Sequence, residues 1–170
     1  GSTGTLVPPK GYLQKLRETC DKHGILLIFD EVITGWGRTG SSFASIEYGV
    51  TPDIMTMAKA TTNGVVPMGV VACKDEIYDS VMDASPMGSV ELFHGYTYSG
   101  IPVAVAAALA VQDIFEKEDI FERAKNLAPY FQKGLFSLQD LESVENIRGY
   151  GMMGGIDTVS YTHLTLPTRS

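Results

Sequence analysis

One lysine and one aspartate stand where they could do chemistry together. Asp30 follows five consecutive apolar residues, 25–29, and Lys59 follows a second short segment, 53–57, that contains three apolar residues. A lysine near other positive charge, or partly removed from water, loses its proton readily and can form a Schiff base with a carbonyl group. An aspartate opposite a ring nitrogen can keep that nitrogen protonated, so that the ring accepts electrons from a breaking bond. These residue types therefore allow carbonyl chemistry on a nitrogen-containing ring, although a single lysine is usually a solvated surface group.

The segments that carry these two residues predict an α/β fold. Residues 25–29 are short and uniformly apolar, which is typical of a strand buried on both faces of a parallel sheet. Residues 53–57 predict a second strand, and 65–73 an extended run. In open parallel sheets, ligands bind beyond the carboxyl ends of the strands, where Asp30 and Glu31 would lie.

Four further segments predict helices from their apolar spacing and their proline and glycine punctuation: 12–24, 74–81, 101–117 and 120–138. Gly24 should end the first of them. Pro129 should kink or divide the last, because proline lacks the backbone donor that a helix interior needs. Residues 144–156 look extended, with four glycines as breaks.

A glycine-rich segment leaves two interpretations open. Residues 35–40, GWGRTG, match G-x-G-x-x-G, whose glycines open a helix and bind a dinucleotide. A glycine and a proline interrupt the residues that follow, so the alternative is a tight loop that brings Trp36 and Arg38 near a neighbouring surface. LLIFDE also imitates part of a P-loop nucleotide hydrolase, but G-x-x-x-x-G-K-[ST] is not found in these residues. A nucleotide-binding module stays the alternative from another class.

Composition narrows the classes of protein and of partner. With 44% hydrophobic and 19% charged residues the chain has the composition of a soluble globular domain. Its net charge of -7, without a basic cluster, argues against nucleic acid as a partner, and no apolar stretch is long enough for a membrane span. Cys20 and Cys73 have no metal-ligand spacing and indicate a reducing compartment, hence a cytoplasmic location. Asp30 has only Glu31 as a nearby ligand type, so no metal site is expected there.

Three motifs, in this order, resemble those of class III pyridoxal-phosphate-dependent aminotransferases. They are LLIFDEVITGWGRTG, PDIMTMAKATTNG followed by PMG, and HGYTYSGIPVAVAAALA. The similarity is greatest to the omega-amino acid:pyruvate branch, which includes beta-alanine:pyruvate transaminase, and it extends from residue 1 to about residue 157. The resemblance implies fold type I, with a mostly parallel sheet in its large domain, and pyridoxal 5'-phosphate as the cofactor.

The resemblance also implies a role for individual residues. Lys59 would form the Schiff base with the cofactor and then move a proton between the substrate α carbon and the cofactor C4′. Asp30 would pair with the ring nitrogen, and Val32 would pack on one face of the ring. Thr97 would hydrogen-bond the phosphate of the cofactor in a partner subunit, so a homodimer or a dimer of dimers is implied.

Two residues depart from the family pattern. Ile33 stands where many members have a glutamine that reaches the cofactor phenolic oxygen, although isoleucine is familiar in the beta-alanine:pyruvate branch. Ile101 stands where a histidine is common, and should affect helix entry more than chemistry. Family members are longer at both ends, and those parts supply a phosphate loop, a stacking aromatic residue and a carboxylate-binding arginine. We therefore expect a fragment that is inactive by itself.

The expected organisation follows from the resemblance. Residues 1–109 would be the C-terminal part of the large, cofactor-binding domain, and 110–157 the start of the small C-terminal domain. Residues 158–170 continue no earlier pattern and read as a non-native tail. The implied reaction is ping-pong transfer of an amino group from an omega-amino acid or amine to pyruvate or another oxo acid. An aminomutase or a decarboxylase of the same family, using the same Lys59 and Asp30, is the nearest alternative.

Overall fold

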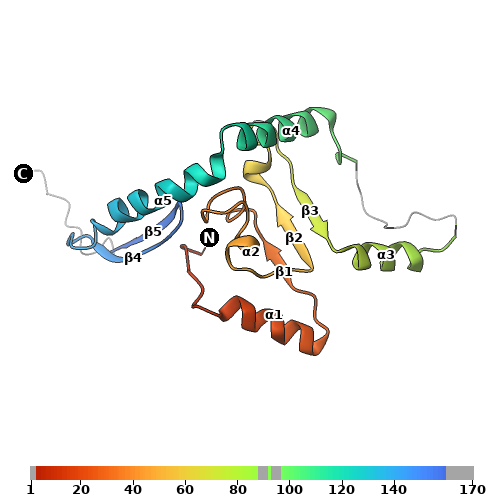
Figure 1. Cartoon of the computed structure of the whole chain (residues 1–170), viewed down its shortest axis with the longest axis horizontal. Helices are drawn as coiled ribbons and strands as arrows, with labels where there is room; N and C mark the ends of the chain where they lie inside the picture. Colours follow the sequence, from red (N-terminus) through yellow and green to blue (C-terminus); the bar gives the residue numbers. More distant parts are fainter. Residues whose placement is uncertain (1–2, 88–91, 93–96, 160–170) are drawn as a thin grey trace, which may run out of the picture.

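Figure 1 shows the chain as a computed structural model, which describes residues 3–87, 92 and 97–159. Residues 94–96 of the third motif and most of the expected tail, 160–170, lie outside the described residues. In chain order the elements are α1 (Tyr12–His23), β1 (Ile28–Asp30), α2 (Ala44–Glu47), β2 (Ile54–Met57), the 3-10 helix η1 (Lys59–Thr61), β3 (Val70–Cys73), α3 (Asp75–Ala84), α4 (Pro102–Lys117), α5 (Ile120–Phe136), β4 (Val144–Tyr150) and β5 (Met153–Thr158). The α/β class is confirmed.

The sheet that contains Asp30 has three strands in the order β1-β2-β3. β1 and β2 are parallel, with Ile28 opposite Ile54 and Asp30 opposite Thr56. β3 runs antiparallel to β2, so the described sheet is mixed, and the expected parallel character holds for its first pair. The connection from β2 to β3 contains only the 3-10 helix η1, whereas a parallel neighbour is usually reached through an α-helix.

Among the described residues β1 is covered on one face, and burial of its other face stays a prediction for the complete protein. Ile28, on the other face of the strand from Phe29, is 56% exposed. The Phe29 side packs against α1, through a small core of Cys20, Leu27 and Val50 surrounded by Leu13, Leu16 and Phe29. α1 ends as predicted, at Gly24, which has the left-handed conformation that glycine adopts without strain.

α4, α5 and the β4–β5 hairpin form the second part of the structure, and Figure 1 shows α5 running beside the hairpin. The small side chains of Ala104 and Ala108 are buried, and α4 packs against η1. Gln132 of α5 donates hydrogen bonds to the carbonyl oxygens of Gly151 and Met153, at 2.8 and 3.0 Å. α5 continues through Pro129, which therefore does not divide the segment. The expected domain boundary, after residue 109, falls inside α4 and stays a prediction.

Asp53 is a buried aspartate that joins three elements at the end of the sheet opposite to Asp30. Asp53 Oδ2 accepts hydrogen bonds from the Leu27 backbone N–H and from Arg17, both at 2.7 Å. Lys74 lies 2.7 Å from its other oxygen, Oδ1. The Leu27 N–H, followed by Lys74 and Arg17, holds the pKa of Asp53 well below its usual range. Asp53 therefore fixes α1, the start of β1 and the end of β3 to one another.

Replacing Asp53 by asparagine is expected to lower the free energy of unfolding of the complete protein at neutral pH by about 2 kcal/mol, because two cations lose their buried partner. The stabilisation requires the ionised carboxylate, whose pKa is depressed on folding. It is therefore fully present above the unfolded-state pKa of about 4 and is lost as the pH falls toward the folded-state value. Urea unfolding across this pH range measures both effects. Asp113, in an exposed pair with Lys117, is the matched control, and Asp113→Asn should change stability little.

Candidate active site

Lys59 lines a cavity of about 740 Å³, whose walls come from the turns after β1 and β2, from α5 and from the β4–β5 hairpin. Val32 and Ile33, from the turn after β1, line the same cavity, as does Arg38. The opposite wall comes from α5 and the hairpin, through Phe131, Met152, Met153 and Gly154. The structure thus brings together two residues that the family resemblance singled out, Lys59 and Val32.

The Lys59 backbone adopts an unusual conformation. β2 ends at Met57, and Lys59 begins η1 with a φ of +49°. A left-handed residue other than glycine costs about 1–3 kcal/mol and persists only where its surroundings hold it. Here the Lys59 carbonyl oxygen accepts hydrogen bonds from Thr62 N and Gly64 N, at 3.3 and 3.2 Å. The lysine therefore projects from a braced turn at the end of a strand.

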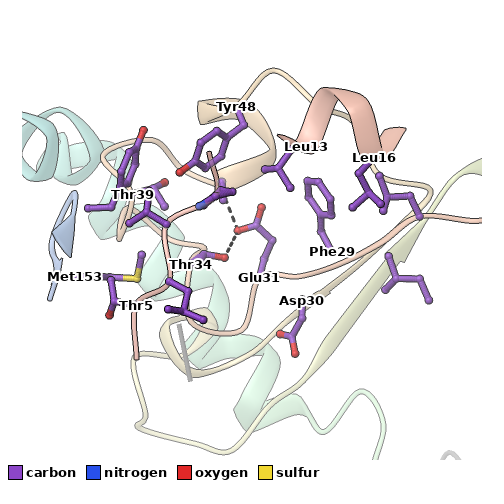
Figure 2. Close-up of a pocket in the computed structure, with 17 residues that line it drawn as sticks. Thr5, Leu13, Leu16, Phe29, Asp30, Glu31, Thr34, Thr39, Tyr48 and Met153 are labelled. Carbon is purple, nitrogen blue, oxygen red and sulfur yellow. Dashed lines mark hydrogen bonds between the residues drawn. The ribbon is translucent and has the colours of Figure 1, made fainter. Parts of the chain in front are cut away.

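Asp30 lies at the same end of the sheet, since it pairs with Thr56 of β2, three residues before Lys59. Its Oδ1 accepts a hydrogen bond from Val32 N at 3.0 Å. Asp30 lines a neighbouring cavity of about 280 Å³ and is not among the described residues that line the Lys59 cavity. Figure 2 shows the Asp30 and Glu31 side chains pointing to opposite sides of the chain.

Glu31, which the sequence analysis treated only as a neighbour of Asp30, is a structural anchor. It is 1% exposed, and its carboxylate accepts hydrogen bonds from the Thr34 hydroxyl and from the Ala44 and Ser45 N–H groups. The dashed lines in Figure 2 include two of these bonds. Glu31 thereby ties the turn after β1 to the start of α2 and fixes the segment that presents Val32. No local spacing rule identifies such a partner thirteen residues away.

The GWGRTG segment is a tight loop, as the second interpretation held. Trp36 N donates to Ser42 O, Gly35 N to Glu31 O, and Gly40 N to Gly37 O. A phosphate loop needs such N–H groups for its ligand, and α2, which follows, has only four residues. Trp36 packs on Phe115 of α4, as expected of a loop that meets a neighbouring surface. The dinucleotide interpretation is therefore wrong.

Thr97 lies in an exposed turn, 97–100, immediately before α4. It is absent from the described residues that line the Lys59 cavity. The assignment of Thr97 to a cofactor phosphate in a partner subunit stays a prediction.

The lining of the Lys59 cavity fits a flat, anionic ligand with a carbonyl group. Its volume falls within the usual range for small-molecule sites. Lys59 offers an amine, Arg38 adds positive charge, and Val32 and Ile33 offer apolar surface. The described lining contains no aspartate or glutamate, although the chain has a net charge of -7. Within the described residues no group of three or more His, Cys, Asp or Glu side chains is placed to hold a metal ion.

The fold and this lysine cavity define a class of protein, and comparison with known proteins identifies it. The sequence model of the class-III aminotransferases matches residues 1–167. The chain belongs to this family.

Its relatives include an omega-aminotransferase from Caulobacter vibrioides, 53% identical over 92% of this chain and 36% of the relative. A beta-alanine–pyruvate aminotransferase from Pseudomonas aeruginosa is 54% identical over 92% of this chain and 35% of its own length. An amine transaminase from an uncultivated Pseudomonas species, solved in its PLP-bound form, superposes with a TM-score of 0.86. It shares 43% identity, over 94% of this chain and 36% of that one. The chain thus spans about a third of the length of the curated relatives it matches.

Proposed function

We propose that the complete protein transfers an amino group from an omega-amino acid or amine to pyruvate or another oxo acid. The relatives support this, because they are an omega-aminotransferase and a beta-alanine–pyruvate aminotransferase at more than half sequence identity. The observation that carries the proposal is the position of Lys59. It lies in a braced turn after β2 and lines a cavity with apolar and cationic walls.

The cofactor that fits this site is pyridoxal 5'-phosphate. When bound, it supplies an aldehyde and a protonated ring that accepts the electrons of the bond broken at the substrate α carbon. Lys59 would hold it through Nζ and afterwards carry the proton that leaves the α carbon. Asp30 would accept a hydrogen bond from the ring nitrogen and keep its proton in place, and Val32 would pack on the ring. The solved relative in its PLP-bound form supports this choice of cofactor.

The test of the function follows the nitrogen atom. The complete protein, supplied with pyridoxal 5'-phosphate, ¹³C-labelled pyruvate and ¹⁵N-labelled β-alanine, is expected to yield alanine that carries both labels and to consume the two substrates in equal amounts. A decarboxylase would instead leave the ¹⁵N on ethylamine without consuming pyruvate, and an aminomutase would yield alanine that carries ¹⁵N but no ¹³C. Either product pattern would overturn the proposal while leaving the cofactor assignment intact.

The partners and the location also belong to the proposal. The expected assembly is a homodimer or a dimer of dimers with a shared active site, and the expected location is the cytoplasm. Among the described residues no helix has the length and apolar composition needed to cross a bilayer.

Thr97 provides a test of the shared site. Its hydroxyl, in the turn before α4, would donate to a cofactor phosphate in the neighbouring subunit, and one such bond is worth about ten- to a hundredfold in affinity. Thr97→Ala should therefore retain Lys59 chemistry and lose activity only at cofactor concentrations that do not saturate the variant. At those concentrations, mixing Thr97→Ala with Lys59→Ala protein and allowing the subunits to exchange should restore activity.

The restoration has a simple origin, since each mixed dimer has one site with both lesions and one with neither. Mass spectrometry of subunits with different tags shows whether exchange has occurred. If exchange is complete and no activity returns, Thr97 acts within its own subunit and the shared-site proposal is wrong.

A further inference from the structure

We propose that Trp36 and Thr61 are positioning residues for Lys59, and that the glycines of GWG serve to place the Trp36 indole. The inference rests on the proposed role of Lys59 and concerns how the protein holds its backbone. It gives a function to the GWGRTG segment, which does not bind a dinucleotide.

A chain of hydrogen bonds leads from Trp36 to the residue before the lysine. The Trp36 Nε1–H donates to Thr61 Oγ1 at 3.1 Å, and the Thr61 hydroxyl donates to the Ala58 carbonyl oxygen, also at 3.1 Å. Thr61 is 3% exposed, so water does not compete for its hydroxyl. A hydroxyl can accept and donate at once, and both capacities are used here. We call this the Trp36–Thr61 chain.

This chain controls the backbone rotation at Lys59. The Ala58 carbonyl lies in the same rigid peptide plane as the Lys59 N–H, so fixing that oxygen fixes the plane from which φ is measured. Thr61 N adds a second bond to the Ala58 oxygen at 3.1 Å. On the other side, Thr62 N and Gly64 N hold the Lys59 carbonyl. With both flanking planes held, Lys59 keeps its left-handed φ of +49° and the direction of its side chain.

The surroundings of Trp36 hold the indole in place for this bond. Its ring stacks on that of Phe115 in α4, with 5.6 Å between the ring centroids. It makes an edge-to-face contact with Phe43, with 5.1 Å between the centroids. A side chain at Gly35 would lie 2.8 Å from the Glu31 carbonyl oxygen and 3.0 Å from the Phe43 ring. Gly37 has a φ of +92°, and a side chain there would come within 3.2 Å of Phe121. The two glycines therefore allow the close packing that aims the Trp36 N–H at Thr61.

Packing alone is the competing explanation, and hydrogen-bond variants separate the two. Trp36→Phe keeps an aromatic ring and removes the N–H, while Thr61→Val keeps the shape and removes the hydroxyl. Thr61→Ser keeps the hydroxyl and is the matched control. The complete protein, loaded with pyridoxal 5'-phosphate, is assayed for kcat and KM with β-alanine and pyruvate, and its cofactor absorbance is titrated with pH. Amide hydrogen exchange of residues 59–64 is followed in the same proteins without cofactor.

We expect Trp36→Phe and Thr61→Val each to lower kcat by about tenfold with KM changed less than about twofold, as for loss of one or two hydrogen bonds that orient a reacting group. The midpoint of the absorbance titration should shift by about half a pH unit or more, and exchange at 59–64 should become about tenfold faster. Thr61→Ser should behave as wild type. The double variant should be little worse than either single variant, because both changes break one chain.

The proposal is overturned if kcat and the titration midpoint are unchanged in both single variants, or if Thr61→Ser is as impaired as Thr61→Val. A Lys59→Ala sample in the same series separates this failure from failure of the proposed function. If Lys59→Ala loses cofactor attachment while the Trp36 and Thr61 variants are unaffected, the function stands and only the positioning role is wrong.

Discussion

Lys59→Ala in the complete protein is expected to lower the rate of amino transfer by about ten-thousandfold, because Lys59 is proposed both to carry the proton and to hold the cofactor. The expectation follows from the place of Lys59 in the cavity with Val32 and from the family to which the chain belongs. Steady-state alanine formation, at saturating cofactor and substrates, is the measurement.

Lys15→Ala is the matched control for this loss. Lys15 is an exposed residue of α1 that pairs with Glu18 and does not line the cavity, so its replacement removes the same charge outside the site. Its activity should equal that of wild type. A Lys59→Ala protein that keeps a tenth or more of the wild-type rate would show that another lysine carries the chemistry.

The second large effect is expected at Asp30. Asp30→Asn should lower the rate of proton removal from the donor by about a hundred- to a thousandfold, since a charge beside the ring nitrogen is worth about 3–4 kcal/mol at this kind of site. Asparagine retains an oxygen that can accept the Val32 N–H, so the turn after β1 should keep its geometry. Stopped-flow absorbance with α-deuterated and ordinary donor isolates the proton-removal step.

Asp53→Asn makes the same chemical change at a structural aspartate and supplies the opposite control. Asp30→Asn should lose rate and keep its stability, whereas Asp53→Asn should lose stability and keep its rate under folding conditions. If both variants lose stability in the same way, Asp30 is only a structural residue. Near-normal turnover of Asp30→Asn would also contradict its proposed role.

Local patterns predicted most elements of the fold, because their causes are local. Gly24 ends α1 through its left-handed conformation, and the spacing of small and apolar residues predicts α4 and α5. Pro129 does not divide its helix, whose packing against α4 and β4 outweighs one missing hydrogen bond. The apolar run before Asp30 predicts a strand correctly, but the run alone does not say which faces other elements cover. The antiparallel β3 likewise depends on a connection whose path the strand pattern does not specify.

The residues of the candidate site were also predicted only in part. Lys59 and Asp30 stand out from their residue types and from the family motifs, and Val32 from the motifs alone. The parallel pairing of β1 with β2 explains why Asp30 and Lys59 share one end of the sheet. The residues that hold the site rigid were not predicted. Glu31 and Thr61 act through partners distant in the sequence, and polar residues of these types are usually on the surface.

Covalent trapping shows directly which lysine holds the cofactor, and we propose that it is Lys59. The complete protein is loaded with pyridoxal 5'-phosphate, reduced with borohydride, digested and mapped by mass spectrometry. We expect a pyridoxyl group on the peptide that contains Lys59, in a stoichiometry near one per chain, and none in Lys59→Ala. A label on Lys74 or any other lysine, with Lys59 unmodified, would contradict it.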